Sequence, residues 1–254
     1  MIREERFRKI SDYVRSRGFA SVDELMGMLG VSKATVRRDL ASLEEAGELS
    51  LVRGGAASLG GTRGEELPYD EKRMSHSAEK ARLGAAAAAL VKDRFAVVID
   101  AGTTTRAMIP FLKDREGLNL VTNDVAIAAD LSSCRGVSVT VTGGQLRQGY
   151  YTLSGYLAEE LIRGMRLDMA FIGFDAVDVR SGCYITNTDE VALKRCMIEA
   201  ADQVVVVCDH TKFSGSAFVS VCSLSQVDIV VTDRELDPAI VRELEKRGVQ
   251  VIFA

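Results

Sequence analysis

The sequence has few of the residues that build metal sites and disulfides. Its two histidines, His76 and His210, lie far apart in the chain, which argues against a histidine-based metal site. The cysteines are odd in number and contain no Cys-x-x-Cys pair; they are Cys134, Cys183, Cys196, Cys208 and Cys222. This pattern is typical of reduced core residues in a cytosolic protein rather than of disulfides or a zinc site. We therefore predict neither a metal nor another cofactor.

Long apolar runs are also absent. No run approaches the length of a membrane span, and the N-terminus is charged from Arg3 to Arg6, unlike a secretory signal. The 254 residues are 47% hydrophobic and 27% charged, as in an ordinary globular protein with one large domain or with a small and a medium one. We expect a cytoplasmic protein without a membrane partner.

Residues 1–57 predict three helices followed by a short β-wing. Apolar residues recur at helical spacing over 2–18, and Ser21 with Glu24 forms a capping box for a second helix that ends at Gly30. A third helix starts at Ser32 or Lys33, and residues 49–56 read as a strand that turns into a hairpin. The order is typical of a winged helix-turn-helix. A plain three-helix bundle would explain the periodicity but not the polar start of the third helix.

The start of that third helix, Ser32 to Leu40, combines small, hydroxyl and basic side chains. A helix that enters the DNA major groove needs short residues for close approach, and polar groups for phosphates and base edges. The net charge of −4 does not exclude DNA, because a binding footprint can be local. The alternative is an ordinary surface helix with a good N-cap. The residues that we expect to contact DNA are Ser32, Lys33, Thr35, Arg37 and Arg38.

Residues 58–76 are rich in glycine, serine and charge, and include Pro68, so we predict a linker there. After a helix from about Ser77 to Lys92, strands and helices alternate over the rest of the domain 77–254. Strands are predicted at 95–99, 118–122, 137–141, 169–172, 204–208, 229–232 and 249–253, and helices near 104–112, 124–132, 155–163, 188–200 and 237–247. Apolar strands separated by helices predict an α/β fold with a parallel sheet covered on both faces.

Polar and glycine residues gather where the predicted strands end, which is where ligands bind in α/β folds. Hydroxyls beside helix amides suit a phosphate, and glycine allows close approach. The first of these segments is neither a Walker loop nor a GxGxxG motif, so no nucleotide is indicated, and a plain capped turn is its alternative. The candidate ligand-binding residues are Asp100, Gly102, Thr103, Thr104, Thr105, Asn123, Gly143, Gly144, Arg147, Asp175, Glu190 and Lys212.

In order and spacing, these motifs resemble the DeoR family of bacterial transcriptional regulators. The resemblance rests on Glu24-Leu25, Val31-Ser32, Thr35 to Leu40, Gly54-Gly55-Ala56, Glu79-Lys80, Asp100 to Thr104, Val121 to Asn123, Gly143-Gly144, Phe171 to Gly173 and Asp209 to Phe213. It implies a winged helix and a sensor domain related to ribose-5-phosphate isomerase and glucosamine-6-phosphate deaminase. It further implies that the protein represses a sugar-catabolic operon and that a phosphorylated sugar controls this repression. The family often has a basic residue and then histidine before Gly-Gly-Ala; Arg53 stands there here, and is the expected DNA contact of the wing.

The alternative function is a sugar-phosphate isomerase with an appended DNA-binding domain. Asp175, Glu190 and Lys212 are similar to residues of the isomerase site. However, such isomerases carry an aspartate three residues before the position of Asp175, where this chain has Ile172, and their lysine beside a Gly-Gly run is replaced around residues 180–182. We therefore predict binding without catalysis, not an enzyme. A pure scaffold would need neither the basic helix nor the polar strand ends. The expected partners are operator DNA, a phosphorylated sugar, and further copies of the chain in a homodimer or homotetramer.

Overall fold

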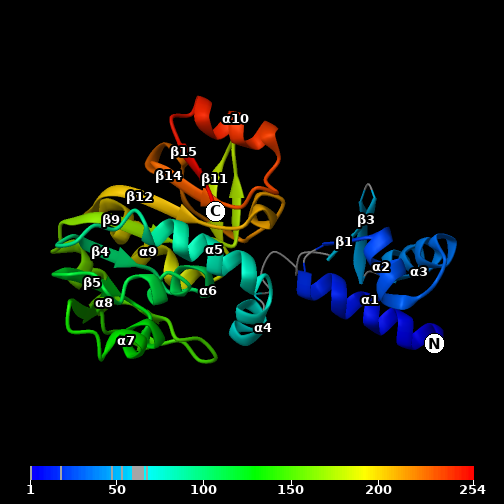
Figure 1. Cartoon of the computed structure of the whole chain (residues 1–254), viewed down its shortest axis with the longest axis horizontal. Coiled ribbons are helices and arrows are strands. Elements are labelled where there is room, and N and C mark those ends of the chain that lie inside the picture. The colour runs from blue at the N-terminus through cyan, green and yellow to red at the C-terminus, as the bar shows by residue number, and fades with distance from the viewer. Residues whose placement is uncertain (1, 18, 47, 53, 59–65, 67) are drawn as a thin grey trace. The chain divides into compact units, whose positions relative to one another are not determined.

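The computed structural model describes residues 2–17, 19–46, 48–52, 54–58, 66 and 68–254. The chain forms two compact units, residues 1–67 and residues 68–254 (Figure 1). No helix in the described part of the chain is both long and apolar enough to span a bilayer.

The first unit consists of three helices and a small antiparallel sheet. The elements are α1 (Arg3–Arg17), β1 (Phe19–Ser21), α2 (Val22–Leu29), α3 (Lys33–Glu45), β2 (Leu49–Val52) and β3 (Gly55–Ser58). The strands lie in the order β1-β3-β2, so the predicted two-stranded hairpin has a third strand that the sequence did not signal. Strand β1 is only three residues long, and its partner β3 lies near the other end of the unit's sequence. A local sequence pattern therefore does not predict β1.

Local capping signals fix the two helices of the helix-turn-helix. The Ser21 side chain accepts a hydrogen bond from the Glu24 amide while Glu24 bonds back, so the predicted capping box is confirmed. Gly30 closes α2 in the left-handed region at φ 66°, which glycine adopts without steric cost. Buried Leu25, Leu40 and Leu43 join α1 and the small sheet in one apolar core.

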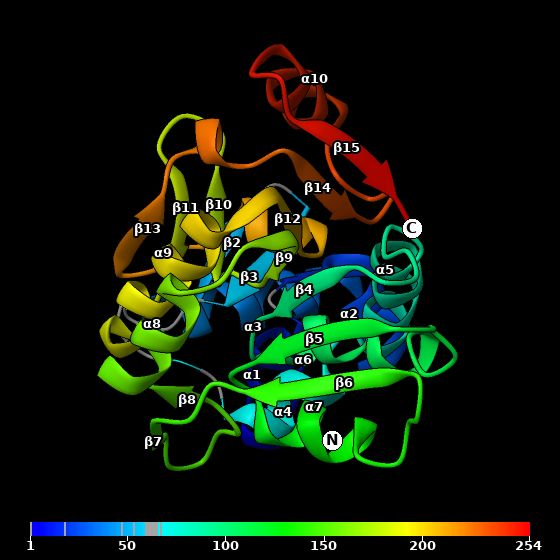
Figure 2. The ribbon, with the colours of Figure 1, turned by 90° about the vertical axis from the view of Figure 1, so that its left-hand side faces the viewer.

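The second unit is built on a seven-stranded sheet in which every pairing is parallel (Figure 2). In their order across the sheet, the strands are β15 (Gln250–Phe253), β14 (Ile229–Thr232), β12 (Ala201–Val207), β9 (Leu167–Ile172), β4 (Ala96–Ile99), β5 (Leu118–Thr122) and β6 (Val137–Val141). All seven predicted strands are present. The predicted parallel α/β sheet is therefore confirmed.

Helices cover both faces of this sheet, as predicted. On one face, α5 (Ser77–Ala88) and α7 (Val125–Leu131) pack on side chains such as Val97 and Ile99; on the other, α8 (Tyr156–Arg163) and α9 (Val191–Ala200) pack around Val98. Successive side chains of one strand thus lie in the apolar cores on opposite faces of the sheet. Because both faces are buried, each strand is a continuous run of apolar residues in the sequence. The remaining helices are α4 (Tyr69–Met74), α6 (Thr103–Arg106) and α10 (Pro238–Lys246), with the short 3-10 turns η1 (Ile109–Phe111), η2 (Thr188–Glu190), η3 (His210–Phe213) and η4 (Leu224–Gln226).

Two smaller sheets lie beside the main one and were not predicted. Strands β10 (Ala176–Asp178), β11 (Gly182–Ile185) and β13 (Val219–Cys222) form one antiparallel sheet, and β7 (Gln145–Leu146) pairs with β8 (Leu153–Ser154). Each strand has four residues or fewer, too short to show an alternating pattern.

Helix α4 falls inside the segment that we predicted to be a linker. Its Tyr69 is buried, and the Tyr69 ring meets the rings of Tyr150 and Tyr151 edge-on at 6.4 and 4.9 Å between centroids. Residues 68–76 therefore belong to the second unit, because their order comes from contacts with side chains far along the chain rather than from a local apolar pattern.

Candidate nucleic-acid interface and candidate anion site

The first turn of α3 is organised by its two hydroxyl residues. Ser32 is the N-cap: its Oγ accepts a hydrogen bond from the Thr35 amide at 3.3 Å and lies 2.9 Å from the Thr35 hydroxyl. An N-cap satisfies one of the free amides at the start of a helix. Both hydroxyls therefore already have a partner within the protein, and their first role is to start the helix.

The remaining residues of α3 divide between an apolar face and a basic face. Val36 and Leu40 are buried, whereas Lys33, Arg37 and Arg38 are exposed. The only nearby salt bridge of Lys33 among the described residues is a contact of 3.6 Å with exposed Asp23. This arrangement places the predicted cationic contacts on the solvent side of the helix.

Asp39, the one acid in the first half of α3, does not oppose those cations. Its side chain is buried and takes two hydrogen bonds from the Arg6 guanidinium, Nε at 2.7 Å and Nη2 at 3.1 Å. The bond with Asp39 raises the pKa of Arg6. Because α1 supplies the neutralising charge, the exposed face of α3 carries a net positive charge.

The wing is described in part. Gly54 turns the hairpin with φ 94°, and the backbone at Gly55 runs so close to β1 that a Cβ there would lie 2.1 Å from the Ala20 oxygen. These two features explain the Gly-Gly pair of the motif. Arg53, the predicted wing contact, lies outside the described residues.

In the second unit, sheet order brings three predicted strand ends together. Strands β12, β9 and β4 are neighbours, so the loops that carry Lys212, Asp175 and Asp100 leave the same edge of the sheet side by side. Asp175 accepts hydrogen bonds from Lys72 Nζ at 3.0 Å and from the Thr186 amide at 2.9 Å. Burial raises the pKa of Asp175, but the ammonium groups of Lys72 and Lys212 outweigh burial and hold it below its ordinary value.

Three lysines from different elements lie close together here: Lys72 and Lys212 act on the Asp175 carboxylate, and Lys80 interacts with both of these lysines. Lys72 comes from α4, Lys80 from α5 and Lys212 from η3. Lys80 is buried and donates to the backbone oxygens of Lys72 and Ser75. Burial, together with the charges of Lys212 and Lys72, lowers the pKa of Lys80 to about 8. The three ammonium groups outnumber the carboxylates of Asp175 and Asp209 beside them, so an anion would relieve the remaining repulsion among the lysines.

A buried ion pair supports the loop that follows β4. Lys194 on α9 donates to the Asp100 carboxylate and to the Gly173 oxygen, the latter at 3.1 Å. Burial lowers the pKa of Lys194, but Asp100 and the more distant Glu190 and Asp175 raise it above its ordinary value, so the lysine is charged. Because Asp100 is fully buried, we assign it to positioning the loop rather than to ligand contact.

The other predicted residues of these loops have distinct places. Thr103 and Thr104 are partly exposed at the start of α6, whereas Thr105 is buried and donates to the Gly102 oxygen at 3.0 Å. The side-chain oxygen of buried Asn123 accepts from the Ala101 amide at 2.7 Å. Thr103 and Thr104 thus remain available to a ligand, while Thr105 and Asn123 hold the loop.

The third strand end contributes a glycine pair and an arginine. Gly143 and Gly144 have φ of 71° and 111°, and a Cβ on Gly144 would lie 2.4 Å from the Ser154 oxygen. Arg147 lies over the Tyr150 ring at 3.8 Å and pairs with Glu190, Nη1 to Oε1, at 2.9 Å. Two residues that we predicted as separate ligand contacts therefore bind each other.

Sequence reasoning did not select Lys72, Lys80 or Lys194 as site residues. Lys80 appeared only within the Glu79-Lys80 motif. Lys194 had a usable signal: it lies three and four residues before the buried Met197 and Ile198, on the apolar face of α9, where a lysine must be paired. Lys72 had none, since its partner Asp175 is 103 residues away.

The two histidines, predicted to be too far apart for a metal site, come together in the fold. Their rings lie 6.5 Å apart, and His210, Asp233 and Glu235 offer ligand atoms within 4.8 Å of one another. Asp233 already accepts from the backbone amide of His210 and lies 2.9 Å from its Nδ1. Because Asp233 is already engaged by His210, we keep the prediction of no metal.

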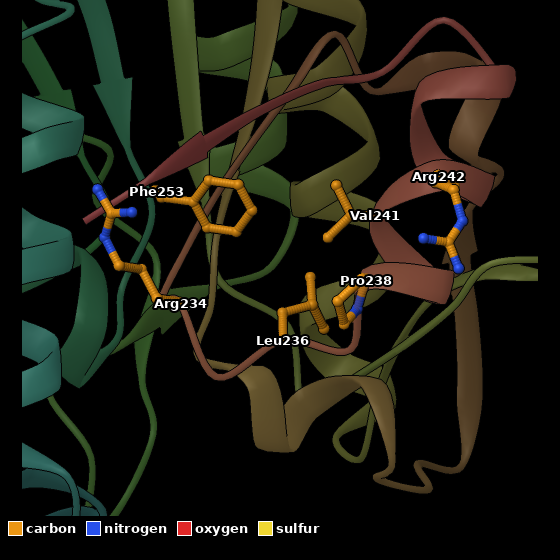
Figure 3. Close-up of a pocket in the computed structure, with 6 residues that line it drawn as sticks. All are labelled: Arg234, Leu236, Pro238, Val241, Arg242 and Phe253. Carbon is orange, nitrogen blue, oxygen red and sulfur yellow. The ribbon is translucent and has the colours of Figure 1, made fainter.

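A separate pocket lies between α10 and the end of β15 (Figure 3). Its volume is about 280 Å³, the Phe253 ring and Val241 face each other across it, and Arg234 and Arg242 lie on opposite sides. Leu236 and Pro238 complete the lining, and none of the predicted ligand residues is part of it. The predominantly apolar lining does not fit a sugar phosphate.

Comparisons with known proteins cover nearly the whole chain. A family model described as a DeoR-like helix-turn-helix domain matches residues 6–61, and one described as the DeoR C-terminal sensor domain matches residues 75–234. The putative aga operon transcriptional repressor of Escherichia coli O157:H7 is 32% identical over 250 residues, which cover 98% of this chain and 93% of that protein. The glycerol-3-phosphate regulon repressor of Escherichia coli strain K12 is 29% identical over 251 residues, 99% of each chain. A ribose 5-phosphate isomerase A from Methanocaldococcus jannaschii overlaps 55% of each chain with 16% identity and a TM-score of 0.41.

Proposed function

Because this chain belongs to the DeoR family of transcriptional regulators, we propose that it represses a carbohydrate catabolic operon under the control of a phosphorylated sugar. The observation that carries the proposal is the cluster of Lys72, Lys80 and Lys212 beside Asp175 and Asp209 at the carboxyl edge of the parallel sheet. The name of the glycerol-3-phosphate regulon repressor supports a phosphorylated effector.

In this proposal the lysines bind the phosphate and the neighbouring polar groups select the sugar. A phosphate dianion offsets the mutual repulsion of the ammonium groups. Asp175 and the hydroxyls of Thr103 and Thr104 are suited to the hydroxyl groups of the sugar. The Arg147–Glu190 pair, in which Arg147 comes from the segment after β6, is suited to further polar groups. Asp100, Thr105, Asn123, Gly143 and Gly144 hold the loops in place.

The DNA-binding half of the proposal rests on the exposed basic face of α3. In a homodimer or homotetramer, two α3 helices enter successive major grooves, so that operator half-sites are spaced by about one helical turn or a multiple of it. The effector controls repression if it binds the two states of the regulator with different affinity. Lys33, Arg37 and Arg38 then supply the phosphate and base-edge contacts.

The second candidate, an isomerase activity, lacks a complete set of catalytic groups. Isomerisation through an enediol needs a carboxylate base and groups that stabilise the oxyanion. The side chain three residues before Asp175 is Ile172, which is fully buried at the end of β9 and cannot exchange protons. Incubation of the protein with aldose and ketose phosphates tests this directly, and interconversion at enzymatic rates would overturn the proposal of binding without catalysis.

The main test is a thermal-shift screen against sugar phosphates, with the parent sugars as controls. A ligand specific for the native state stabilises it by about 2.7 kcal/mol at 100 times its Kd. We expect one sugar phosphate, and not its parent sugar, to raise the Tm and to change the anisotropy of labelled DNA from upstream of the gene. Lys212→Ala should lose the Tm shift but still bind that DNA. Equal shifts from the parent sugars, or none from any phosphate at millimolar concentration, would refute the effector assignment.

A further inference from the structure

Two of the five free cysteines face each other across neighbouring antiparallel strands. Cys183 in β11 is the direct partner of Cys222 in β13. Residues in such opposed positions have Cα atoms about 4.5–5.5 Å apart, within the range of about 4.4–6.8 Å that a disulfide spans. The two thiols also interact with each other directly. Strand pairing therefore places the two Cα atoms in the range that a disulfide can span, although the residues are far apart in sequence.

The residue next to Cys183 sets this close approach. Gly182 has φ 109°, and a Cβ at this position would lie 2.1 Å from the Cys222 oxygen and 2.9 Å from the Ser223 Cα. Only glycine allows the two strands to run so near each other here. The pairing register also shifts between Cys183 and Tyr184, so the irregular step of this strand pair lies directly beside the cysteines.

The surroundings give the two thiols different roles. The hydrogen bond from Cys183 lowers the pKa of Cys222; burial opposes this, and the backbone amide of Cys183 and the charges of Arg195 and Lys194 lower it further. The same hydrogen bond and burial raise the pKa of Cys183. Strand position points the same way: Cys222 ends the edge strand β13, whereas Cys183 lies in the central strand β11, so we assign the attack on an oxidant to Cys222 and the resolving step to Cys183.

Both thiols are buried, so oxidation requires a local opening, and the edge of the small sheet is the shortest route to Cys222. The strand order is β10-β11-β13, so β13 is an edge strand, and Cys222 is its last residue, followed by exposed Ser223. Edge strands open locally more readily than central ones. By contrast, Cys208 directly follows β12 of the main sheet, and burial raises the pKa of its thiol.

We propose that Cys183 and Cys222 are a redox-active pair that hydrogen peroxide converts into a disulfide. The Cys222 thiolate attacks one peroxide oxygen, the O–O bond breaks, and the leaving hydroxide takes a proton to become water. The Cys183 sulfur then attacks the resulting sulfenic acid, the S–S bond forms, and a second water leaves. Two thiols and one peroxide thus give one disulfide and two waters, and thiol reductants reverse the change.

The disulfide would join two strands that border the anion site. Thr186, whose amide holds Asp175, directly follows β11. On the other side, the Arg195 guanidinium of α9 donates to the Ser220 and Val221 oxygens of β13, both at 2.9 Å. Oxidation would therefore fix the small sheet beside the site, but formation of the disulfide does not depend on the proposed effector.

Peptide mapping of the intact protein tests the proposal. After peroxide treatment, alkylation of the remaining thiols and trypsin digestion, Cys183 lies in the peptide 181–194 and Cys222 in 213–234; Cys134 lies in 116–135, and Cys196 and Cys208 share 196–212. We expect the first two peptides to appear as one linked species lacking two hydrogen atoms. Thiol titration of the denatured protein should fall from five to three, and dithiothreitol should restore five.

Two single variants provide the controls. Cys222→Ser should abolish the linked species, and Cys134→Ser, at a partly exposed cysteine outside the pair, should leave it unchanged. The Tm of each variant shows whether it is folded. The proposal is wrong if peroxide that oxidises Cys134 in the wild-type protein leaves peptides 181–194 and 213–234 separate and alkylated. It is also wrong if Cys183 links to a cysteine other than Cys222.

Discussion

At the scale of single residues, the charge that α3 presents depends on a residue of another helix. Asp39 directly follows Arg37 and Arg38 in the sequence and would weaken their field if it were exposed. Instead Arg6 of α1 binds it in the interior through two hydrogen bonds. The exposed face therefore keeps the full charge of its arginines, and each of them is a separate point at which DNA binding can be tested.

Arg38→Ala should weaken operator binding by about tenfold or more, since a DNA contact of this kind is worth roughly 1–3 kcal/mol. If Arg38 binds phosphate, the slope of log affinity against log salt should also fall by about one for each phosphate that the variant no longer neutralises. Fluorescence anisotropy over a salt series measures both quantities. Arg135→Ala removes the same charge from an exposed loop of the second unit and should change neither. Normal operator binding by Arg38→Ala would contradict our assignment of the DNA-binding face.

Lys80 makes effector binding depend on pH. Its pKa is about 8 in the folded protein and 10.5 ordinarily, so between these values the unfolded chain binds more protons and stability rises with pH. A bound phosphate favours the charged ammonium and raises the pKa of Lys80 again. Sugar-phosphate binding near pH 8–9 should therefore take up protons, and affinity should fall as pH rises from about 7 to 9.

Titration calorimetry in two buffers of different ionisation enthalpy measures this proton uptake. Lys80→Met should remove it, and Lys113→Met, which changes an exposed lysine of the same unit, should retain it. If Lys80→Met still takes up protons on binding, another residue of the cluster is the group that is protonated.

Among the helices, α5 shows that the effect of a glycine on stability depends on its packing as well as on its helix propensity. Its run of alanines and Gly84 allows the helix backbone to approach the α6–η1 segment. A Cβ on Gly84 would lie 2.3 Å from the Ala107 oxygen and 2.8 Å from the Met108 amide nitrogen. Gly27 in α2 is also within a helix, but a Cβ added there would point into open space, with no packing atom within 4 Å. These two glycines have the same helix propensity and opposite packing environments.

Gly84→Ala should therefore destabilise the second unit by about 1–3 kcal/mol, because the new methyl group overlaps backbone atoms that cannot move aside. Gly27→Ala should stabilise the first unit by about 0.5–1 kcal/mol through helix propensity alone. Amide hydrogen exchange of peptides from each unit gives the two changes separately. Stabilisation by both substitutions would mean that the approach of α5 to Ala107 is not close.

At the scale of the whole molecule, the boundary between the units decides which residues complete the anion site. The predicted boundary at residue 77 would leave α4 outside the second unit. In the structure, the Arg106 guanidinium donates to the Tyr69 hydroxyl at 3.3 Å, and Lys72 binds Asp175. Helix α4 is therefore part of both the core and the site.

A fragment 68–254 should fold and bind the sugar phosphate, whereas a fragment 77–254 should be less stable and bind it more weakly. Loss of a buried aromatic side chain costs about 3–5 kcal/mol, and each kcal/mol lowers the Tm by roughly 2–4 °C in a domain of this size. Thermal unfolding with and without the ligand measures both effects. If the two fragments had equal stability and equal affinity for the sugar phosphate, α4 would be part of the linker and not of the second unit.

Elements whose signals are local can be predicted from the sequence. The capping box at Ser21, the N-cap at Ser32, the glycine that closes α2 and the seven apolar strands all follow from residues within about one element of each other. The parallel sheet follows as well, because alternation of strands and helices leaves few other topologies. These signals were enough to predict which strand ends carry the polar residues.

Which side chains meet depends on the tertiary fold. Lys194 lies 94 residues from Asp100 and Lys72 lies 103 residues from Asp175, so no local pattern identifies the partner of either lysine. The pairing of Cys183 with Cys222, the burial of Asp39 against Arg6 and the order of α4 have the same origin. Periodicity shows which face of an element is buried, but the partner of a buried charge or thiol is set by strand order and register, which the whole fold determines.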